Sequence, residues 1–489
     1  MARERELKLS APPGYRIPSL DDLDLKLTPA TERRLTTTYY DTPDLRLARW
    51  GFTMRYRAGE GWTVKLPSSG SGGVVVRDEI EFPGSPSKPP AGALALLRGL
   101  LRRDEPVLVA RLRTLRRISS IVDSGEHRLA EVDDDEVSVI DGRRLAARFR
   151  QLEVELAADA PDDLLSRLST LFQAAGAAPD PVSKAARALG PRAVAPPEAH
   201  PKAVRPGDPA GAAVAAAIAA STARLLLHDP GVRLGDDPEA VHQARVATRR
   251  LRADLRTFRD FVDPDWAAAL VEELRWAAGD LGDVRDSEVL TELLEGLARR
   301  LPSGDRAAGL RLARRLGQVR DDARRRLIAT LDSPRYLELI EALLAASHEP
   351  PLTEASAAPA EEALPPQVKA GWRRIRRAVR DLPDDPPDEH LHRVRILAKR
   401  LRYAAEAVGT VLNGYGKLAK DAAALQDVLG RHQDAVVAQG WLREQRPKLT
   451  PTQAFVAGEL WGLAGGQAAQ SRLEWPAAWK ALRKSAGGL

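Results

Sequence analysis

Residues 241–255 read VHQARVATRRLRADL, and residues 391–405 read LHRVRILAKRLRYAA. In each copy a His opens a series of basic residues at spacings of three and four, which places their side chains on one face of an α-helix. The two series are His242, Arg245, Arg249, Arg252 and Arg256, and His392, Arg395, Lys399 and Arg402. The repeat therefore predicts two related helices, each with a stripe of positive charge.

A second pair of similar segments follows the stripes in the same order, LGDVRDSEVL at residues 281–290 and LGRHQDAVVA at residues 429–438. Two motifs repeated in one order indicate that a helical unit was duplicated. The sequence from residue 210 onward is rich in Ala, Leu and Arg, and a Pro-rich stretch at 349–366 divides it. We expect an all-α region at 210–489, with halves at about 210–348 and 367–489.

Two explanations compete for the stripes: a solvated basic face that pairs with acidic helices, or a groove for a polyanion. Like charges at helical spacing repel each other, and no acid falls within 242–252 or 392–402. Because guanidinium groups form paired bonds to phosphate oxygens, the duplication favours a groove for polyphosphate. We expect Asp286 and Asp434 to orient the basic side chains. His432 either joins the groove or packs in the core.

Residues 1–190 alternate with the period of a β-strand, in segments such as GFTMRYRA, GWTVKLPS, GVVVRDEIEF and RQLEVEL. Turn residues separate the segments, which predicts many antiparallel strands that close into a barrel. A Pro/Ala-rich segment at 191–209 is typical of a linker. The predicted fold class is therefore α+β multidomain, with an antiparallel barrel at 1–190 followed by the helical region at 210–489.

Charged residues alternate along these strands, so the charged side chains of one strand share a face. They are Glu4, Glu6, Lys8, Arg55, Arg57, Lys65, Arg77, Glu79, Glu81, Arg111, Arg113, Glu153 and Glu155. If these faces point outward, the charges are ordinary surface; if they point inward, acids and bases line a tunnel. Carboxylates suit Mg²⁺ or Mn²⁺, and Arg and Lys hold phosphate oxygens, so a tunnel would suit metal-assisted phosphoryl transfer.

The composition excludes several kinds of site. The chain of 489 residues has no Cys, which excludes disulfides, thiolate zinc sites and cysteine catalysis. Its N-terminus, MARERELKLS, has no apolar segment, and we expect neither a signal peptide nor a membrane-spanning helix. Aromatic residues make up 5% and form no stacking platform beside the stripes, which disfavours specific nucleic-acid binding. We expect a cytoplasmic protein.

The two stripes, with LGDVRDSEVL and LQDVLGRHQDAVVA after them, resemble the signature of the CHAD family, named for a conserved histidine α-helical domain. The resemblance covers about residues 205–489. It implies two antiparallel four-helix bundles related by pseudo-two-fold symmetry, with a basic channel that binds inorganic polyphosphate. The stripe residues and His432 are then the candidates for polyphosphate binding.

The opening ERELK resembles the Glu-x-Glu-x-Lys motif of the CYTH family, the triphosphate tunnel metalloenzymes, and YYDTPDLRL, MRYR, WTVK, RDEIE, QLEVEL and SKAARAL follow in the family's order. The resemblance implies that Glu4, Glu6, Asp133, Glu153 and Glu155 bind metal, with Glu131 and Asp135 as alternatives to Asp133. It implies substrate contacts from Lys8, Arg55, Arg57, Lys65, Arg77, Arg113 and Lys184, and catalytic roles for Glu4, Glu6, Lys8, Glu79 and Glu81. Arg113 is chosen as the substrate contact of the family's basic strand, although Leu115 interrupts the expected alternation of basic residues before Arg117.

The leading hypothesis is a hydrolase of inorganic triphosphate, or of a related phosphoanhydride, that uses Mg²⁺ or Mn²⁺ and carries a polyphosphate-binding second domain. The alternative is a non-catalytic protein that locates on polyphosphate. An adenylate cyclase ranks third, because no base-recognition element is evident. The expected partners are inorganic triphosphate and polyphosphate, with no specific nucleic acid and no membrane, and association with polyphosphate granules would follow from the second domain.

Overall fold

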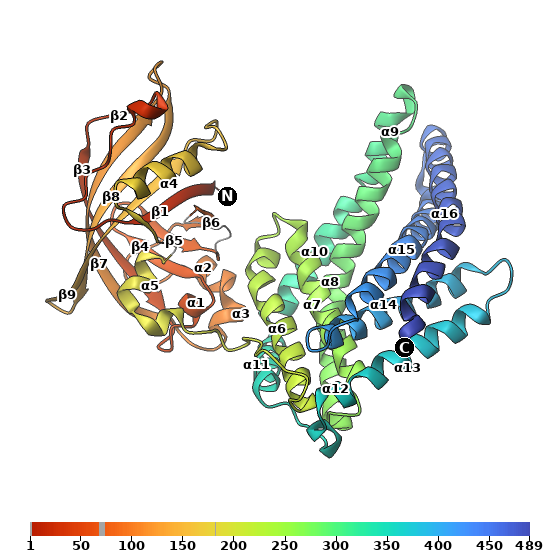
Figure 1. The fold of residues 1–489 in the computed structure, drawn as a ribbon. Coiled ribbons are helices and arrows are strands. Elements are labelled where there is room, and N and C mark those ends of the chain that lie inside the picture. Colours follow the sequence, from red (N-terminus) through yellow and green to blue (C-terminus); the bar gives the residue numbers. More distant parts are fainter. Residues whose placement is uncertain (1, 68–73, 181) are drawn as a thin grey trace. The chain divides into compact units, whose positions relative to one another are not determined.

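The chain folds into two compact units, Met1–Pro197 and Glu198–Leu489 (Figure 1). A computed structural model describes the backbone of residues 2–67, 74–180 and 182–489, and the side chains of the same residues except 2–4 and 74–77. The division between the units falls inside the predicted linker. Residues before the division pack on the first unit, since the Arg49 guanidinium donates to the carbonyl oxygen of Pro196 at 2.8 Å.

The first unit is an antiparallel sheet that closes on itself. Its strands, in the order in which they pair, are β1 (Ala2–Ser10), β6 (Val74–Phe82), β5 (Gly61–Lys65), β4 (Thr53–Arg57), β3 (Thr31–Asp41), β7 (Val107–Val122), β8 (Arg128–Asp141) and β9 (Arg144–Leu156). Strand β9 pairs back with β1, so the predicted barrel is confirmed. Two short strands add to it: β2 (Lys26–Leu27) pairs with β7, and β10 (Ala178–Pro179) pairs with β1.

Short helices cover this sheet. They are α1 (Arg46–Arg49), α2 (Ala91–Leu96), α3 (Arg98–Leu101), α4 (Leu164–Ala174) and α5 (Lys184–Leu189), with 3-10 turns at Asp21–Leu23 and Pro191–Val194. Leu7 and Leu9 of β1 pack in one apolar cluster with Leu168 and Phe172 of α4. Because successive side chains of a strand point to opposite faces, this burial turns the even-numbered residues of β1 into the barrel. The apolar positions thus decide which way the charged positions face.

The second unit is all α. Its first half contains α6 (Ala210–Leu234), α7 (Pro238–Thr257), α8 (Pro264–Ala298), α9 (Ser303–Ala313), α10 (Leu316–Asp332) and α11 (Pro334–His348). The Pro-rich stretch holds a 3-10 turn at Glu354–Ala357 and a one-turn helix, α12 (Ala360–Ala363). Its second half contains α13 (Pro365–Arg380), α14 (Asp388–Gly409), α15 (Gly416–Gln445) and α16 (Pro451–Ser485), with 3-10 turns at Arg446–Lys448 and Ala486–Gly488. The predicted fold class is confirmed for both units.

The two repeated pairs of segments meet where the halves join. Helix α7 packs on α8 and α14 packs on α15, while α7 contacts α14 and α8 contacts α15 across the join. Both basic stripes therefore lie on helices at the centre of the unit, α7 and α14. Because α7 and α14 contact each other, their two basic stripes lie close together in the structure.

One helix of the described residues, α6, is long and apolar enough to cross a membrane, with a mean hydropathy of 1.7. More than half of that segment, 56%, is buried inside the unit, as in the core helix of a globular protein. It also carries Asp229, whose carboxylate lies 2.7 Å from the Arg233 guanidinium and accepts from the Tyr336 hydroxyl at 2.9 Å. No such helix was predicted from the sequence, and a buried core helix has the same length and composition.

Candidate functional site

The barrel encloses a cavity of about 310 Å³ whose lining is mostly charged. We call this cavity the tunnel. The predicted residues that line it are Glu6, Lys8, Arg55, Arg57, Lys65, Glu79, Glu81, Asp133, Glu153, Glu155 and Lys184. The open choice between outward and inward charged faces is thus settled for these strands, which turn their charges inward.

Acids gather on the wall formed by β1, β9 and β8. Glu6 is paired in register with Glu155, and Glu155 with Glu131. Two residues further along β1, Lys8 is paired in register with Glu153, and Glu153 is paired with Asp133. The Cβ atoms of cross-strand neighbours on one face lie about 5 Å apart, so these residues form an acidic wall on one side of the tunnel. Glu131, which was only an alternative to Asp133, lines the tunnel as well.

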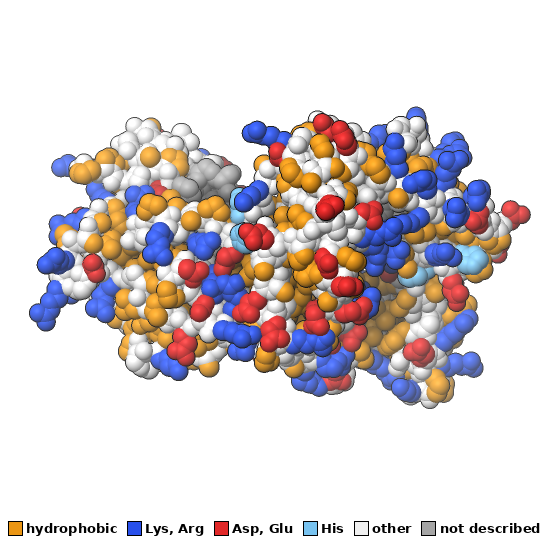
Figure 2. Space-filling model, turned by 90° about the horizontal axis from the view of Figure 1, so that it is seen from below, with side chains coloured by type: hydrophobic (Ala, Val, Ile, Leu, Met, Phe, Trp, Pro, Cys, Tyr) orange, Lys and Arg blue, Asp and Glu red, His pale blue; other side chains and the backbone are white. Residues whose placement is uncertain are grey.

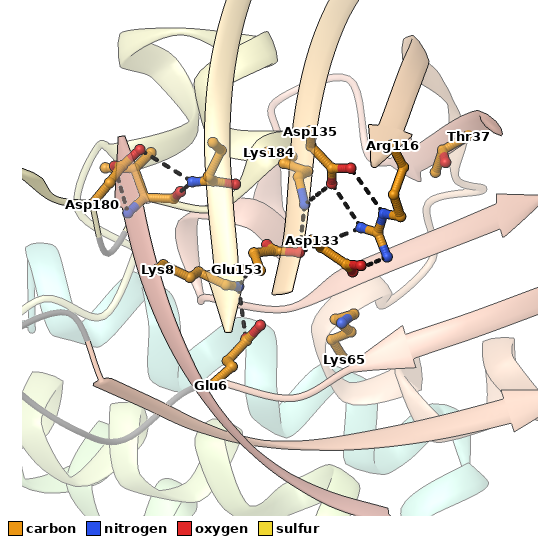
Figure 3. A network of polar contacts seen from close by, with 12 residues as sticks. Glu6, Lys8, Thr37, Lys65, Arg116, Asp133, Asp135, Glu153, Asp180 and Lys184 are labelled. Atoms are coloured by element: carbon orange, nitrogen blue, oxygen red, sulfur yellow. Dashed lines mark hydrogen bonds and ion pairs between the residues drawn. The ribbon is translucent and has the colours of Figure 1, made fainter. Parts of the chain in front are cut away.

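Lysines hold the acidic wall together (Figure 3). The Lys8 ammonium lies 2.8 Å from Glu6 and 3.7 Å from Glu153. The Lys184 ammonium, from the start of α5, lies 2.5 Å from Glu153 and 2.7 Å from Asp135. Burial acts to raise the pKa of Glu153, but Lys184, Lys8 and Arg116 lower it well below its usual value. Glu153 is therefore a carboxylate at neutral pH.

Arg116, rather than the predicted Arg113, supplies the basic contact from β7. Its guanidinium donates to both oxygens of Asp135, at 2.8 and 2.7 Å, and contacts Asp133 (Figure 3). Ile121 of β7 packs in the same outer apolar cluster as Leu7 and Leu9, so the odd-numbered residues of β7 face outward. The even-numbered Arg116 and Ile118 line the tunnel. Arg113 is exposed on the opposite face, and its assignment as a substrate contact is corrected. The exposed Arg111 shares the outward parity of Arg113.

The opposite wall, on β4 and β5, is basic. Arg55 lies 3.7 Å from Glu79, and Lys65 contacts the same carboxylate. The buried Arg57 donates to Glu60 at 2.8 Å and to the Thr37 hydroxyl at 3.2 Å. Burial, and then the neighbouring Arg55, lower the pKa of Arg57. An anion bound beside Arg57 would offset both the cost of burying its charge and the repulsion from Arg55.

Two predicted residues have side chains outside those that the structure describes. The backbone pairs Glu4 of β1 with Arg77 of β6. Conversely, Arg33, Glu60 and Arg116 line the tunnel although the sequence had not predicted them as site residues. Glu60 belongs to a turn, and Arg33 lies on β3, where strand parity gave no reason to choose an inward face.

The tunnel offers oxygen ligands for a metal ion. Burial first, and then the like charges of Asp135 and Glu153, raise the pKa of Asp133 to about 7, against the opposing effect of Arg116. The buried Oδ1 atom of Asp133 has no hydrogen-bond partner among the described atoms. Carboxylates without thiolate or imidazole suit a hard cation such as Mg²⁺ or Mn²⁺. Among the described side chains, no three acids are gathered closely enough to hold a metal ion.

The helical unit has its own charged cavity, of about 560 Å³, between α7, α8, α14 and α15. We call it the groove. The predicted residues that line it are His242, Arg245, Arg249, Arg252, His392, Arg395 and Lys399, with Asp286 and Asp434. Arg245 lies 2.7 Å from Asp286, as expected for an orienting acid. Arg285 also lines the groove and was missed, although it lies within the repeated LGDVRDSEVL segment.

Positive charge in the groove is poorly compensated. Burial first, and then Arg249, Arg395, Arg245 and Arg252, lower the pKa of Lys399 to about 7. The buried Nε atoms of Arg249 and Arg395 find no hydrogen-bond partner among the described atoms. Arg249 instead stacks over the Tyr403 ring at 5.6 Å. A buried N–H group without a partner is costly, and a bound anion would offset that cost.

Three predicted groove residues lie elsewhere. His432 is 1% exposed and packs beside Asp388, with its Nε2 atom 3.2 Å from that carboxylate, so the core alternative holds. Arg402 donates to Glu406 at 2.7 Å. Arg256 is exposed one turn beyond the groove, where it lines a neighbouring cavity. Helical spacing identified the correct face but not where the groove ends.

Comparison with known families agrees with this division. Residues 2–189 match the CYTH domain, and residues 216–443 match the CHAD domain. The chain belongs to the proteins that join a CYTH domain to a CHAD domain. The CYTH domain places the first unit in a family of enzymes that act on triphosphates or related phosphoanhydrides and generally depend on a divalent metal ion.

Similar proteins include MT2285 and Rv2226 of Mycobacterium tuberculosis, both described as uncharacterized. Each is 36% identical over 446 residues, which cover 84% of this chain and 82% of the relative. Among solved structures, PptA from Streptomyces chartreusis is 28% identical and matches 56% of this chain and 99% of its own, with a TM-score of 0.48. The CHAD domain from the plant Ricinus communis is 26% identical, with 58% and 95% covered and a TM-score of 0.48.

Proposed function

We propose that the CYTH domain hydrolyses inorganic triphosphate, or a related phosphoanhydride, with Mg²⁺ or Mn²⁺, and that the CHAD domain binds inorganic polyphosphate. The observation that carries the first half is the pairing of an acidic wall with a basic wall inside one closed barrel. A metal–triphosphate complex has the matching polarity, because its cation faces acids while its phosphates face Arg and Lys.

The basic wall would bind the phosphates. Arg55, Arg57 and Lys65 project into the tunnel from neighbouring strands. Their charge-assisted hydrogen bonds to phosphate oxygens would hold the substrate in one orientation. Arg57 is buried, so much of its desolvation cost is already met before the substrate arrives.

The acidic wall would hold the cation. Glu6, Asp133, Glu153 and Glu155 are the described candidates, with Glu4 from the start of β1 and Glu131 beside them. A bound divalent cation would neutralise charge that develops during phosphoryl transfer. Lys8 and Lys184 hold Glu6 and Glu153 in place from the side. Glu79 and Glu81, the two predicted catalytic acids of β6, face the cavity.

Phosphate release from a panel of substrates tests the enzymatic proposal. The panel contains inorganic triphosphate, polyphosphate, thiamine triphosphate and nucleoside triphosphates, each with Mg²⁺ or Mn²⁺. We expect release from inorganic triphosphate or a related member of the panel, and complete loss when EDTA is added. No release from any substrate, together with retained polyphosphate binding, would support the non-catalytic alternative. Release of pyrophosphate and a cyclic nucleotide from ATP would support a cyclase.

The second half of the proposal rests on the excess of positive charge in the groove. Two Arg side chains, whose Nε atoms have no hydrogen-bond partner in the part of the chain that the structure describes, and a Lys with a depressed pKa line one cavity. A flexible chain that carries charge on every unit can neutralise all of them at once and release counterions as it binds. Association with polyphosphate granules would follow from this affinity.

A further inference from the structure

A second cationic surface lies next to the groove, over α13 and α14. Two cavities of about 790 and 290 Å³ adjoin there and share Arg373, Arg374 and Arg400 in their linings. The larger one adds Arg377 and Arg393, and the smaller one adds Arg256 of α7. We call these six arginines the α13–α14 surface. Figure 2 shows one face of the molecule on which Lys and Arg side chains gather beside a hollow in the helical unit.

Among the described residues, no acid forms an ion pair with any of the six arginines of the α13–α14 surface. Asp260 and Asp381, the acids in its linings, lie 3.4 Å from Arg259 and 3.0 Å from Arg380. Among the described residues, no carboxylate opposes the burial and the neighbouring Arg256 and Arg374 that lower the pKa of Arg400. A basic face that served only solubility would be interspersed with acids.

The groove and the α13–α14 surface meet at Arg256. Burial, and then Arg275 and Arg256, lower the pKa of Arg252 in the groove. Arg256 acts in the same way on Arg400 of the second surface. Arg256 is thus near enough to affect the pKa of an arginine in the groove and of one in the α13–α14 surface. Along α7, Arg249 and Arg256 are separated by two turns, about 10 Å, so the positive charge continues without a gap.

The internal repeat breaks at this position. In the second copy, the residue that corresponds to Arg256 is Glu406. Glu406 accepts from Arg402 at 2.7 Å and from Arg250 at 2.5 Å. An acid therefore neutralises one end of the pseudo-symmetric arrangement, while Arg256 extends the positive charge at the other. Because of this asymmetry, a polyanion bound in the groove would leave it at the Arg256 end rather than at the Glu406 end.

We infer that a polyphosphate chain held in the groove leaves it past Arg252 and Arg256 and continues over the α13–α14 surface, so that the CHAD domain selects polyphosphate by length. This inference rests on the proposed polyphosphate binding by the groove. Short oligophosphates fill the groove alone and gain nothing from the second surface. Long chains reach both, and the second contact is intramolecular, so it adds affinity without a new encounter.

The test compares short oligophosphate with long polyphosphate on the full-length protein. The variant is Arg373→Glu, Arg374→Glu and Arg377→Glu, which reverses three exposed charges on α13. The buried residues Val368, Trp372 and Ile375 still anchor that helix. The matched control is Arg300→Glu, Arg311→Glu and Arg314→Glu, three exposed arginines in and beside α9 with the same change in net charge.

By calorimetric titration, we expect the α13 variant to bind long polyphosphate about tenfold more weakly or worse, with a shallower salt dependence. Its affinity for short oligophosphate should equal that of the wild type, and the control should match the wild type for both ligands. Equal losses for both lengths, equal losses in the control, or unchanged binding of long chains would overturn the inference. Loss of RNA binding with no loss of polyphosphate binding would overturn it as well, by assigning the surface to nucleic acid.

The same titrations separate this inference from the proposal beneath it. If charge reversal in the groove leaves the binding of both lengths unchanged, the groove does not bind polyphosphate and the proposed function fails. If groove variants lose both lengths while the α13 variant loses neither, the groove binds and the length-selective path is wrong.

Discussion

The tunnel of the CYTH domain and the groove of the CHAD domain are both crowded with charge, but they balance it differently. In the tunnel, Lys8 and Lys184 lie against Glu6 and Glu153, so each sign has a partner nearby. In the groove, Lys399 faces several arginines and its pKa falls to about 7. A site for a metal–phosphate complex needs both signs, whereas a site for a bare polyanion needs one. The difference predicts that each site can be disabled without affecting the other.

The largest expected effect is on the acidic wall. Glu6→Gln removes a carboxylate oxygen from the proposed metal site with little change in shape, and with Glu4→Gln it should abolish triphosphate hydrolysis. Polyphosphate binding should stay at the wild-type level. Phosphate release and calorimetric titration on the same samples measure both.

The control for that variant is Glu105→Gln, because Glu105 is an exposed acid of the same domain. Thermal unfolding shows whether the barrel remains folded, since the substitution leaves Lys8 without its closest carboxylate, 2.8 Å away. Wild-type hydrolysis by the folded double variant would exclude a metal site on this wall.

The next effect is the converse change in the groove. Arg249→Glu with Lys399→Glu should weaken polyphosphate binding by about a hundredfold or more, because each charge-assisted bond contributes about 1.5–3 kcal/mol. Triphosphate hydrolysis should be unaffected. Exposed Arg300 and Lys420, each changed to Glu, give the control with the same charge difference. A matching loss in that control would mean that net charge, rather than the groove, attracts the ligand.

A smaller effect is expected when a single arginine of the basic wall is removed. Arg55→Ala should lower kcat/KM for triphosphate by about tenfold to a hundredfold, because one phosphate contact is lost. Arg113→Ala should leave kcat/KM unchanged, since Arg113 faces outward. Steady-state kinetics of the two variants side by side decide the point. The reverse result would restore the sequence-based choice of Arg113.

Much of the tunnel was predictable because apolar and charged residues alternate where one face of a strand is buried. Leu7 and Leu9 pack outward, and this turns Glu6 and Lys8 inward. On β7 the same reasoning failed. Arg111, Arg113 and Arg116 are all basic, and charge alone does not tell which face of that strand is inside. The available signal was Ile121, which has the parity of Arg113 and packs outward in the same apolar cluster as Leu7 and Leu9.

The groove shows a different limit of sequence reasoning. Spacings of three and four identify the face of a helix, but they carry no information on where a neighbouring helix ends the cavity. Arg256 and Arg402 therefore fall outside, although both lie on their stripes. Glu406 is four residues beyond Arg402 and pairs with it, a contact that helical spacing allows. Its bond to Arg250, 156 residues away in sequence, depends on the packing of α7 against α14.

The smallest expected effect is a pH dependence of polyphosphate affinity. Burial and four neighbouring arginines lower the pKa of Lys399 to about 7 in the free protein. A phosphate beside the ammonium group favours its charged form, so the pKa of Lys399 in the complex is higher. Binding then takes up a proton above about pH 7, and the affinity falls as the pH rises from there to the pKa in the complex. Below about pH 7 the affinity no longer changes through this group.

Calorimetric titration between about pH 7.5 and 9.5 checks this, because imidazoles are neutral there and Asp and Glu are ionised. Proton uptake, measured in buffers of different ionisation enthalpy, should approach one proton per protein at the upper end. The control is Lys399→Arg, whose guanidinium stays charged throughout this range. That variant should bind polyphosphate at pH 7.5 about as well as the wild type, and its affinity should not change with pH. A Lys399→Arg variant with the same proton uptake as the wild type would assign the titration to another group, and Lys399 would then be charged before the ligand arrives.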